Sequence, residues 1–327
     1  MKKILVTGAD GLLGSNLVRE LLNRKYRVRA FVQSERCVNT LDDLPIERFD
    51  GDLLNKNSVS HAIKGCNYII HAAASTSVWP SRNRQVWEVN VQGTRNVSSC
   101  ALKANIERMI YVGTANSFGF GTKDNPGHEE HTYLADKYKI DYLDSKYEAH
   151  KAILEAVNDG LRAIIVNPTF MIGPYDSGPS SGALLIALCK KKIVGFTRGG
   201  KNYIYVKDVA SAIANALTMG RIGQGYILGN ANLSYQEAFK LIGDTLGIQA
   251  PQMKIPDWAV LLSGRLFTLT ARVTGQPPIV SYPMAKISLD DHYFTPKKAI
   301  EELMLPQTPL EVAFREAFEW FKENKYI

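Results

Sequence analysis

The chain has 327 residues, which corresponds to about two domains at roughly 150 residues each. Hydrophobic residues make up 45% and charged residues 22%, a balance that excludes a disordered chain and a collagen-like rod. The net charge of +7 is a mild excess without aromatic-interleaved basic stretches, so no nucleic acid is expected as a partner. No run reaches the roughly 18 uncharged apolar residues of a membrane span, and no secretory segment is recognisable, so we expect a soluble, cytoplasmic protein.

Short apolar runs alternate with helical patterns in the first half of the chain. The apolar runs lie at residues 3–7, 28–32, 68–73, 109–112 and 163–166. The helical patterns lie at residues 12–24, 58–64, 84–104 and 142–159. Alternation of this kind favours βαβ units, and continuous apolar strands are typical of a sheet that is covered on both faces. The sequence therefore predicts an α/β fold with a Rossmann-type, doubly wound parallel sheet.

The character of the chain changes after Asn167-Pro168, where glycine, proline and serine mark loops. A further strand, helix and strand are expected within residues 203–229, and an amphipathic helix at 310–324. We expect residues 1–170 to form a dinucleotide-binding domain to which 203–229 returns. Residues 171–202 and 230–327 then form a smaller, mostly helical substrate lobe. Residues 258–273 are apolar at helical spacing, which is typical of a core helix or a dimer face; a lid over the substrate is the alternative.

Three glycines, Gly8, Gly11 and Gly14, lie between the first strand and the first helix. Glycine permits a tight turn and a close approach of backbone to a pyrophosphate, and the helix N-terminus beyond it attracts phosphate. A simple strand-to-helix turn needs one glycine rather than three. The sequence therefore predicts a dinucleotide site here, which includes Leu12 and Leu13.

The end of the second strand bears on the choice between NAD and NADP. NAD enzymes usually present an acidic residue there, but this chain has Gln33. Ser34 and Arg36 could bind a 2′-phosphate, whereas Glu35 between them would repel it. We expect NADP. Asp52 and Leu53, after the third strand, are candidates for the adenine amine; a helix N-cap is the alternative for Asp52.

Tyr142 and Lys146 are spaced i and i+4, so they project from the same face of a helix. A free tyrosine has a pKa near 10, and a nearby lysine ammonium is expected to lower it. Tyr142 could then exchange a proton with an alcohol or carbonyl while a nicotinamide exchanges hydride. Alone, such a pair is also found on surface helices; the glycine loop favours the catalytic interpretation.

Thr114 follows the strand at 109–112, at the sheet edge where doubly wound folds bind ligands. Its hydroxyl could donate to the developing oxyanion of a carbonyl substrate, a role for which Ser117 is the rival. Five residues are candidates for substrate contact: Ser75, Trp79, Asn116, Ser117 and Phe170. The histidines of Gly127–His131 lack the spacing of a zinc site, so no metal is expected.

These motifs occur in the order that is typical of extended short-chain dehydrogenases/reductases of the NAD-dependent epimerase/dehydratase type. The chain resembles this family over essentially its whole length. The motifs are Thr7–Gly14, His71–Ala74, Asn90–Thr94, Thr114, Tyr142 with Lys146, Asn167-Pro168 and Val206–Ala210. The chain most resembles the dihydroflavonol-4-reductase group and the hopanoid-associated, epimerase-like proteins. The resemblance implies a Thr114/Tyr142/Lys146 active site supported by Asn90. It also implies cofactor contacts from Ala72, Ala73, Ala74, Asn167, Pro168 and Thr169.

Two departures from the family are present. Plant-type reductases commonly carry arginine at the position of Gln33, which weakens the NADP prediction. The pair Val112-Gly113 stands where Ser-Ser or Thr-Ser is usual, and Gly113 could loosen that turn.

The expected function is that of an NAD(P)-dependent oxidoreductase that interconverts a carbonyl and a secondary alcohol. The main alternative is a nucleotide-sugar epimerase or dehydratase with tightly bound NAD, for which Arg198, Lys201 and Arg265 are candidates to hold a diphosphate. A non-catalytic dinucleotide sensor is the second alternative. The partner is expected to be a small molecule, with a hydrophobic ligand as one candidate. The resemblance implies a homodimer through the helices at 84–104 and 142–159.

Overall fold

The computed structural model describes residues 1–33 and 39–327, and its largest element is a seven-stranded parallel sheet. The strands follow the order β3-β2-β1-β4-β5-β6-β9, and each neighbouring pair is parallel. The strands are β1 Lys3–Thr7, β2 Arg27–Val32, β3 Glu47–Asp50, β4 Tyr68–His71, β5 Arg108–Val112, β6 Ala163–Pro168 and β9 Gly225–Leu228. The chain order reverses between β1 and β4, where such sheets open a crevice at the carboxyl ends of their strands. The predicted Rossmann-type sheet is confirmed.

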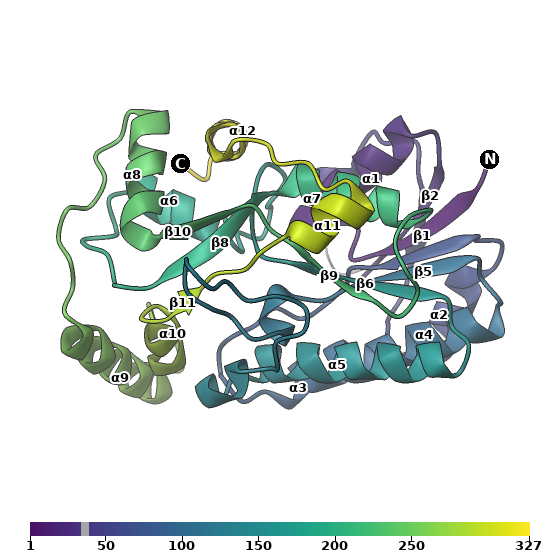
Figure 1. Ribbon diagram of the computed structural model, residues 1–327, viewed down its shortest axis with the longest axis horizontal. Coiled ribbons are helices and arrows are strands. Elements are labelled where there is room, and N and C mark those ends of the chain that lie inside the picture. The colour runs from purple at the N-terminus through teal and green to yellow at the C-terminus, as the bar shows by residue number, and fades with distance from the viewer. Residues whose placement is uncertain (34–38) are drawn as a thin grey trace.

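Helices cover both faces of this sheet (Figure 1). On one face α1 (Leu12–Asn23) packs against α7 (Val206–Ala216). On the other face α4 (Gly93–Lys103) packs against both α2 (Lys56–Ile63) and α5 (Asp141–Asn158). Both layers of helices are needed because the strands between them are apolar on both sides.

Strand β1 shows how the sheet is covered on both sides. Ile4 and Val6 enter one buried apolar cluster, while Leu5 between them enters a second cluster. All three side chains are at most 1% exposed. Side chains alternate between the faces of a strand, so a continuous apolar run places hydrophobic groups against both helical layers.

The helix that was predicted over residues 84–104 is divided in the structure. It consists of α3 (Arg84–Trp87), a π-helical turn (Glu88–Gln92) and α4. A π-helical turn inserts one residue without ending the helix, so the apolar spacing of the sequence does not disclose it.

A second, four-stranded sheet forms the centre of the substrate lobe. It contains β8 (Gly200–Tyr205), which pairs with β7 (Phe170–Ile172), β10 (Ala231–Ser234) and β11 (Asp291–His292). The partners of β8 are two to four residues long, too short to show a strand period, so the lobe was expected to be mostly helical. Of residues 203–229, α7 and β9 join the large domain, while the end of β8 stays in the small sheet.

The other elements of the lobe and of the C-terminal part are helices. They are α6 Ala183–Cys189, α8 Tyr235–Leu246, α9 Asp257–Thr274, α10 Tyr282–Ile287, α11 Lys297–Leu303 and α12 Leu310–Glu323. Only Val260, Gly264 and Ala271 of α9 are buried, so residues 258–273 do not form a core helix, whereas a dimer face or a lid stays a prediction. Within the described ranges, none of the helices has the length and apolar character needed to cross a bilayer.

Candidate active site

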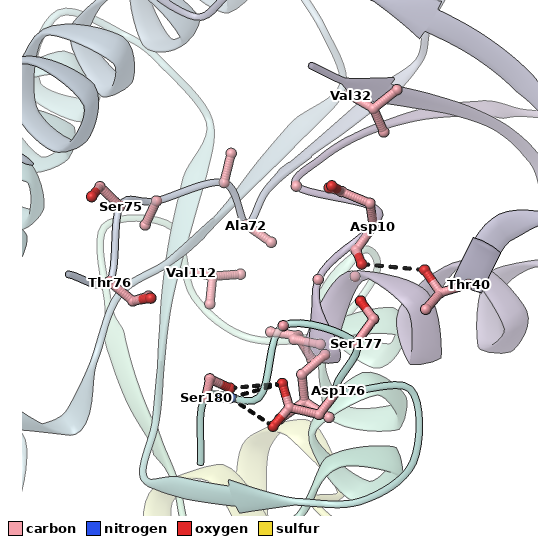
Figure 2. Close-up of a pocket in the computed structure, with 18 of the residues that line it drawn as sticks. Asp10, Val32, Thr40, Ala72, Ser75, Thr76, Val112, Asp176, Ser177 and Ser180 are labelled. Carbon is pink, nitrogen blue, oxygen red and sulfur yellow. Dashed lines mark hydrogen bonds between the residues drawn. The ribbon is translucent and has the colours of Figure 1, made fainter. Parts of the chain in front are cut away.

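A cavity of about 1340 Å³ lies at the carboxyl edge of the seven-stranded sheet. Figure 2 shows three groups of residues around it: Ala72, Ser75 and Thr76; Asp10, Val32 and Thr40; Asp176, Ser177 and Ser180. Fourteen of the predicted site residues line it: Gly8, Gly11, Leu12, Leu13, Gly14, Gln33, Asp52, Leu53, Ala72, Ala73, Ala74, Ser75, Tyr142 and Lys146. The glycine loop and the Tyr142/Lys146 pair, far apart in sequence, therefore face the same space.

The glycine loop is shaped by the lack of room for side chains. A Cβ on Gly8 would lie 2.7 Å from the Ala73 backbone, and one on Gly14 would lie 2.0 Å from the Gly8 carbonyl oxygen. Gly8 also has a φ of +67°, which disfavours other residues. Gly11 is different, because a Cβ there would approach only the Gly8 oxygen, at 3.6 Å, among the described atoms within 4 Å. Gly11 thus keeps space open on the cavity side.

The open side of Gly11 fits a dinucleotide. Gly11 is the N-cap of α1, and no side chain makes a capping hydrogen bond there. The free N–H groups of a helix N-terminus bind phosphate, and the absence of a Cβ lets a pyrophosphate come close to them. The residues present are therefore suited to hold the pyrophosphate of NAD or NADP.

The expected adenosine end of the cavity contains Gln33, Asp52 and Leu53. Asp52 accepts a hydrogen bond from the Leu54 N–H at 2.9 Å, whereas Asn55 is the residue that caps α2. The alternative interpretation of Asp52 as the helix cap is therefore wrong. Ser34 and Arg36, which the sequence offered for a 2′-phosphate, lie outside the described residues.

Tyr142 and Lys146 lie one turn apart on α5. The Lys146 ammonium donates a hydrogen bond to the Val112 carbonyl oxygen at 2.7 Å and lies 4.6 Å from the centre of the Tyr111 ring. Lys146 is only 3% exposed, and burial lowers its pKa to about 7. Lys146 is therefore held at the end of β5 with a proton that is easily lost.

The structure does not bear out the expected lowering of the Tyr142 pKa by Lys146. Burial raises the pKa of Tyr142, because the phenolate would lose its hydration, and a side-chain hydrogen bond with Thr114 only opposes that rise. Thr114 is 7% exposed and begins the short turn Ala115–Ser117. Thr114 thus interacts with Tyr142 without being part of the cavity lining, and Tyr142 keeps its proton at neutral pH.

Asn90 connects the loop after β4 to α5. It lies in the π-helical turn and is 2% exposed. Its Oδ1 accepts from the Ser75 N–H at 2.7 Å, and its Nδ2 donates to the Ser75 carbonyl at 3.0 Å and to the Ser145 hydroxyl at 2.9 Å. Because Ser145 directly precedes Lys146, Asn90 is placed to position α5 against the cavity wall.

Three predicted cofactor residues at the end of β6 lie outside the cavity lining. Asn167 is fully buried, and a Cβ on Gly113 would lie 2.3 Å from its side-chain oxygen. Gly113 therefore leaves room for the observed position of the Asn167 side chain. Pro168 pairs with Leu228 in β9, and Thr169 donates from its hydroxyl to Asn202 at 2.8 Å. Direct contact of these residues with the cofactor stays a prediction.

The predicted substrate residues other than Ser75 also lie outside the lining. Asn116 is hydrogen-bonded through Oδ1 to His292 at 3.0 Å. The Phe170 ring packs edge-on against Tyr203, with centres 5.4 Å apart. Ser117 is buried and Trp79 is half-buried. Their contact with a substrate stays a prediction.

One wall of the cavity was not predicted from the sequence. The Arg19 guanidinium lies 3.7 Å from the centre of the Tyr175 ring, whose centre is 6.1 Å from that of Trp320 in α12. Asp176 accepts hydrogen bonds from the Ser180 and Gly182 N–H groups, which closes the loop between them (Figure 2). The glycine and proline residues of 173–182 signalled a loop, but no sequence signal connects the chain's last helix with the cavity.

The three cations that are candidates for the diphosphate of an epimerase substrate each contact other side chains. Arg198 forms an ion pair with Asp257 at 2.9 Å, and the Lys201 ammonium lies 4.4 Å from the centre of the Phe170 ring. Arg265 lies on α9, with its guanidinium 5.0 Å from the centre of the Tyr282 ring. None of the three lines the cavity, and their role in binding a diphosphate stays a prediction.

Comparisons with known proteins agree with this geometry. The family model "NAD dependent epimerase/dehydratase family" matches residues 4–229. A putative dihydroflavonol 4-reductase of Synechocystis is 33% identical, with 98% of this chain and 95% of the relative covered. Sterol demethylase protein B of Methylococcus capsulatus is 29% identical, with 99% of each chain covered. The crystal structure of gox2253 superposes with a TM-score of 0.87 at 30% identity over the whole of both chains. The chain therefore belongs to the NAD-dependent epimerase/dehydratase family of extended short-chain dehydrogenases/reductases.

Proposed function

We propose that this protein reduces a ketone group on an apolar ring compound with NADPH as the hydride donor. The observation that carries the proposal is that Tyr142 and Lys146 line the same cavity as the glycine loop. Val89, Val112 and Met171 add apolar surface to that cavity. The names of the two relatives refer to a dihydroflavonol and a sterol, which are both ring compounds.

The residues supply the proton chemistry of such a reduction. When bound, the nicotinamide supplies hydride to the carbonyl carbon. Tyr142 donates its proton to the carbonyl oxygen, and its raised pKa keeps it protonated at neutral pH, as a proton donor requires. Thr114 lies near the Tyr142 hydroxyl and partly opposes the rise of its pKa. Lys146, with a pKa of about 7, is suited to return a proton to the phenolate afterwards.

The decisive experiment removes only the phenolic hydroxyl. Tyr142→Phe should lower the rate of NADPH oxidation with a dihydroflavonol or a 3-oxosteroid by roughly a thousandfold. Its affinity for NADPH should stay close to that of the wild type, because the dinucleotide is held mainly by the glycine loop. Both quantities can be measured, by the loss of NADPH absorbance and by fluorescence titration.

Tyr147 provides the matched control on the same helix. Its ring stacks on Tyr133 with centres 4.3 Å apart, and it is not part of the cavity lining. Tyr147→Phe should therefore leave turnover unchanged. If Tyr142→Phe retains activity within about tenfold of the wild type, Tyr142 is not the proton donor. A wild type that binds NADPH but turns over none of a broad carbonyl panel would favour the sensor alternative.

The preference for NADP within this proposal rests on Gln33. An uncharged side chain lines the cavity where NAD enzymes usually present a carboxylate. Gln33→Asp should weaken NADPH binding by charge repulsion and strengthen NADH binding through the ribose hydroxyls. A wild type that binds NADH more tightly than NADPH in the same titration would contradict the preference.

We further propose a homodimer, as is frequent in this family, through α4 and α5. These two helices pack side by side on one face of the sheet (Figure 1). Light scattering should then give twice the mass of the chain, and a monomer at all concentrations would contradict this arrangement.

A further inference from the structure

Helix α9 carries an apolar face that residues 1–33 and 39–327 leave uncovered. The face consists of Trp258, Leu262, Leu266, Leu269 and Val273, which are 69%, 48%, 56%, 61% and 80% exposed. Their spacing of three and four residues places them on one side of the helix. We call these five residues, with the flanking Arg265 and Arg272, the α9 face.

The opposite side of α9 is firmly held by the lobe. Val260, Gly264 and Ala271 are buried, and a Cβ on Gly264 would lie 2.7 Å from the Ala285 Cβ in α10. Figure 1 shows α9 and α10 together at the outer end of the lobe. The helix is therefore apolar on two sides, and its inner side alone accounts for its place in the fold. Large exposed apolar patches of this kind mark a surface that binds another body.

The charges around the α9 face all have one sign. Residues 258–289 contain no Asp or Glu, whereas Arg265, Arg272 and Lys286 are cationic. Within the described residues none of these three forms an ion pair; Arg265 and Lys286 each lie 5.0 Å from the centre of the Tyr282 ring. Asp257, at the start of the helix, is paired with Arg198 at 2.9 Å. The face therefore combines exposed hydrophobic groups with cations that lack an acidic partner.

We propose that the α9 face docks on the surface of an anionic phospholipid bilayer. An amphipathic helix with Trp and Leu on one side and Arg beside them lies in the plane of the bilayer, with its apolar groups at the boundary between headgroups and acyl chains. Lipid phosphates then pair with the arginines. A second copy of the chain fits less well, because a symmetric contact would bring Arg265 and Arg272 of both copies together without an acid. The proposal stands independently of the proposed function.

The experiment is flotation of the full chain with vesicles. One set contains phosphatidylcholine alone, and the other contains equal parts of phosphatidylcholine and phosphatidylglycerol. The wild type should float with the anionic vesicles, and added salt should weaken that binding. Arg265→Gln with Arg272→Gln should lower the partition coefficient roughly 30-fold, because each arginine contributes about one kcal/mol of binding free energy at an anionic lipid surface. Leu266→Ser with Leu269→Ser should lower it by at least roughly tenfold.

Met304 provides the control, because it is apolar and 65% exposed but lies at the end of α11. Met304→Ser should float like the wild type, and thermal melts should show that all variants are folded. A wild type that does not float with anionic vesicles overturns the proposal, as does flotation that both double variants retain. A leucine double variant that loses self-association in light scattering but still floats would assign the face to a dimer instead.

Discussion

The glycine loop and helix α9 each use a glycine for a close approach, but they differ in what surrounds it. The Gly8 carbonyl oxygen lies where a Cβ on residue 14 would be, within a loop enclosed by β1, β4 and α1. Gly264 admits Ala285 on one side of α9, while the other side of that helix is exposed. The contacts that shape the loop thus come from the chain itself, and its open side is left for the proposed dinucleotide. The helix has an apolar face for which the described part of the chain provides no partner.

The largest expected effect is at the glycine loop, where two substitutions three residues apart, Gly11→Ala and Gly14→Ala, should act differently. Gly11→Ala places a methyl group in open space, so the fold should survive while NADPH affinity falls by on the order of 100-fold. Gly14→Ala forces the backbone of Gly8 to move, so both stability and affinity should fall. Thermal melts and NADPH titration separate the two outcomes.

Gly178 is the control for the loop. It also lines the cavity, but no described atom lies within 4 Å of a Cβ placed there. Gly178→Ala should therefore leave the stability unchanged, in contrast to Gly14→Ala. If Gly11→Ala binds NADPH like the wild type, the pyrophosphate does not approach Gly11 and the proposed position of the dinucleotide is wrong.

Substitution of Lys146 tests how much the buried lysine beside the cavity lowers the free energy of unfolding. Its pKa is about 7 in the folded chain and 10.5 in an ordinary lysine, so between these values the unfolded chain binds more protons. The stability of the wild type should therefore rise with pH across that window. Lys146→Met cannot titrate, and below about pH 7 it should be more stable than the wild type by a few kcal/mol.

Urea unfolding at several pH values measures this difference. The advantage of Lys146→Met should shrink as the pH rises towards 10.5, where lysine is neutral in both states. Reductase activity should be lost at every pH. A stability difference that does not change with pH would show that Lys146 is not buried as a charge.

A smaller effect is expected at Asn90. Asn90→Ala removes three hydrogen bonds to Ser75 and Ser145, and should cost about 2 kcal/mol of unfolding free energy and lower kcat. The NADPH affinity should change less than kcat, since Asn90 does not line the cavity. Asn57, which is exposed on α2, is the control, and Asn57→Ala should be neutral. Equal kcat in Asn90→Ala and wild type would argue against a positioning role.

The smallest effect on stability is expected on the α9 face. Leu266→Ser should change the unfolding free energy by no more than about 0.5 kcal/mol, because the side chain is already exposed. On the same helix Val260 is 6% exposed, and Val260→Ser should cost about 2 kcal/mol. If Leu266→Ser proved as costly as Val260→Ser, the face would be covered in solution, and the contrast with the glycine loop would fail.

Much of the large domain could be predicted from local patterns. The strand at 3–7 has the predicted bounds, α1 ends one residue before the predicted helix, and α5 begins and ends one residue before the predicted helix. The glycine loop was identifiable because its backbone excludes side chains at Gly8 and Gly14. The π-helical turn at Asn90 and the strand β7 were missed, because one inserted residue or three strand residues leave no period to detect.

The sequence by itself determined the parallel sheet, the glycine loop and the helical spacing of Tyr142 and Lys146, since these depend on contacts within a few residues or on a repeated apolar spacing. Tertiary structure alone decided that burial raises the Tyr142 pKa, that Trp320 borders the cavity and that α9 lies at the surface. Each of these depends on what desolvates or covers a side chain. That surrounding comes from segments distant in the chain, which no local pattern specifies.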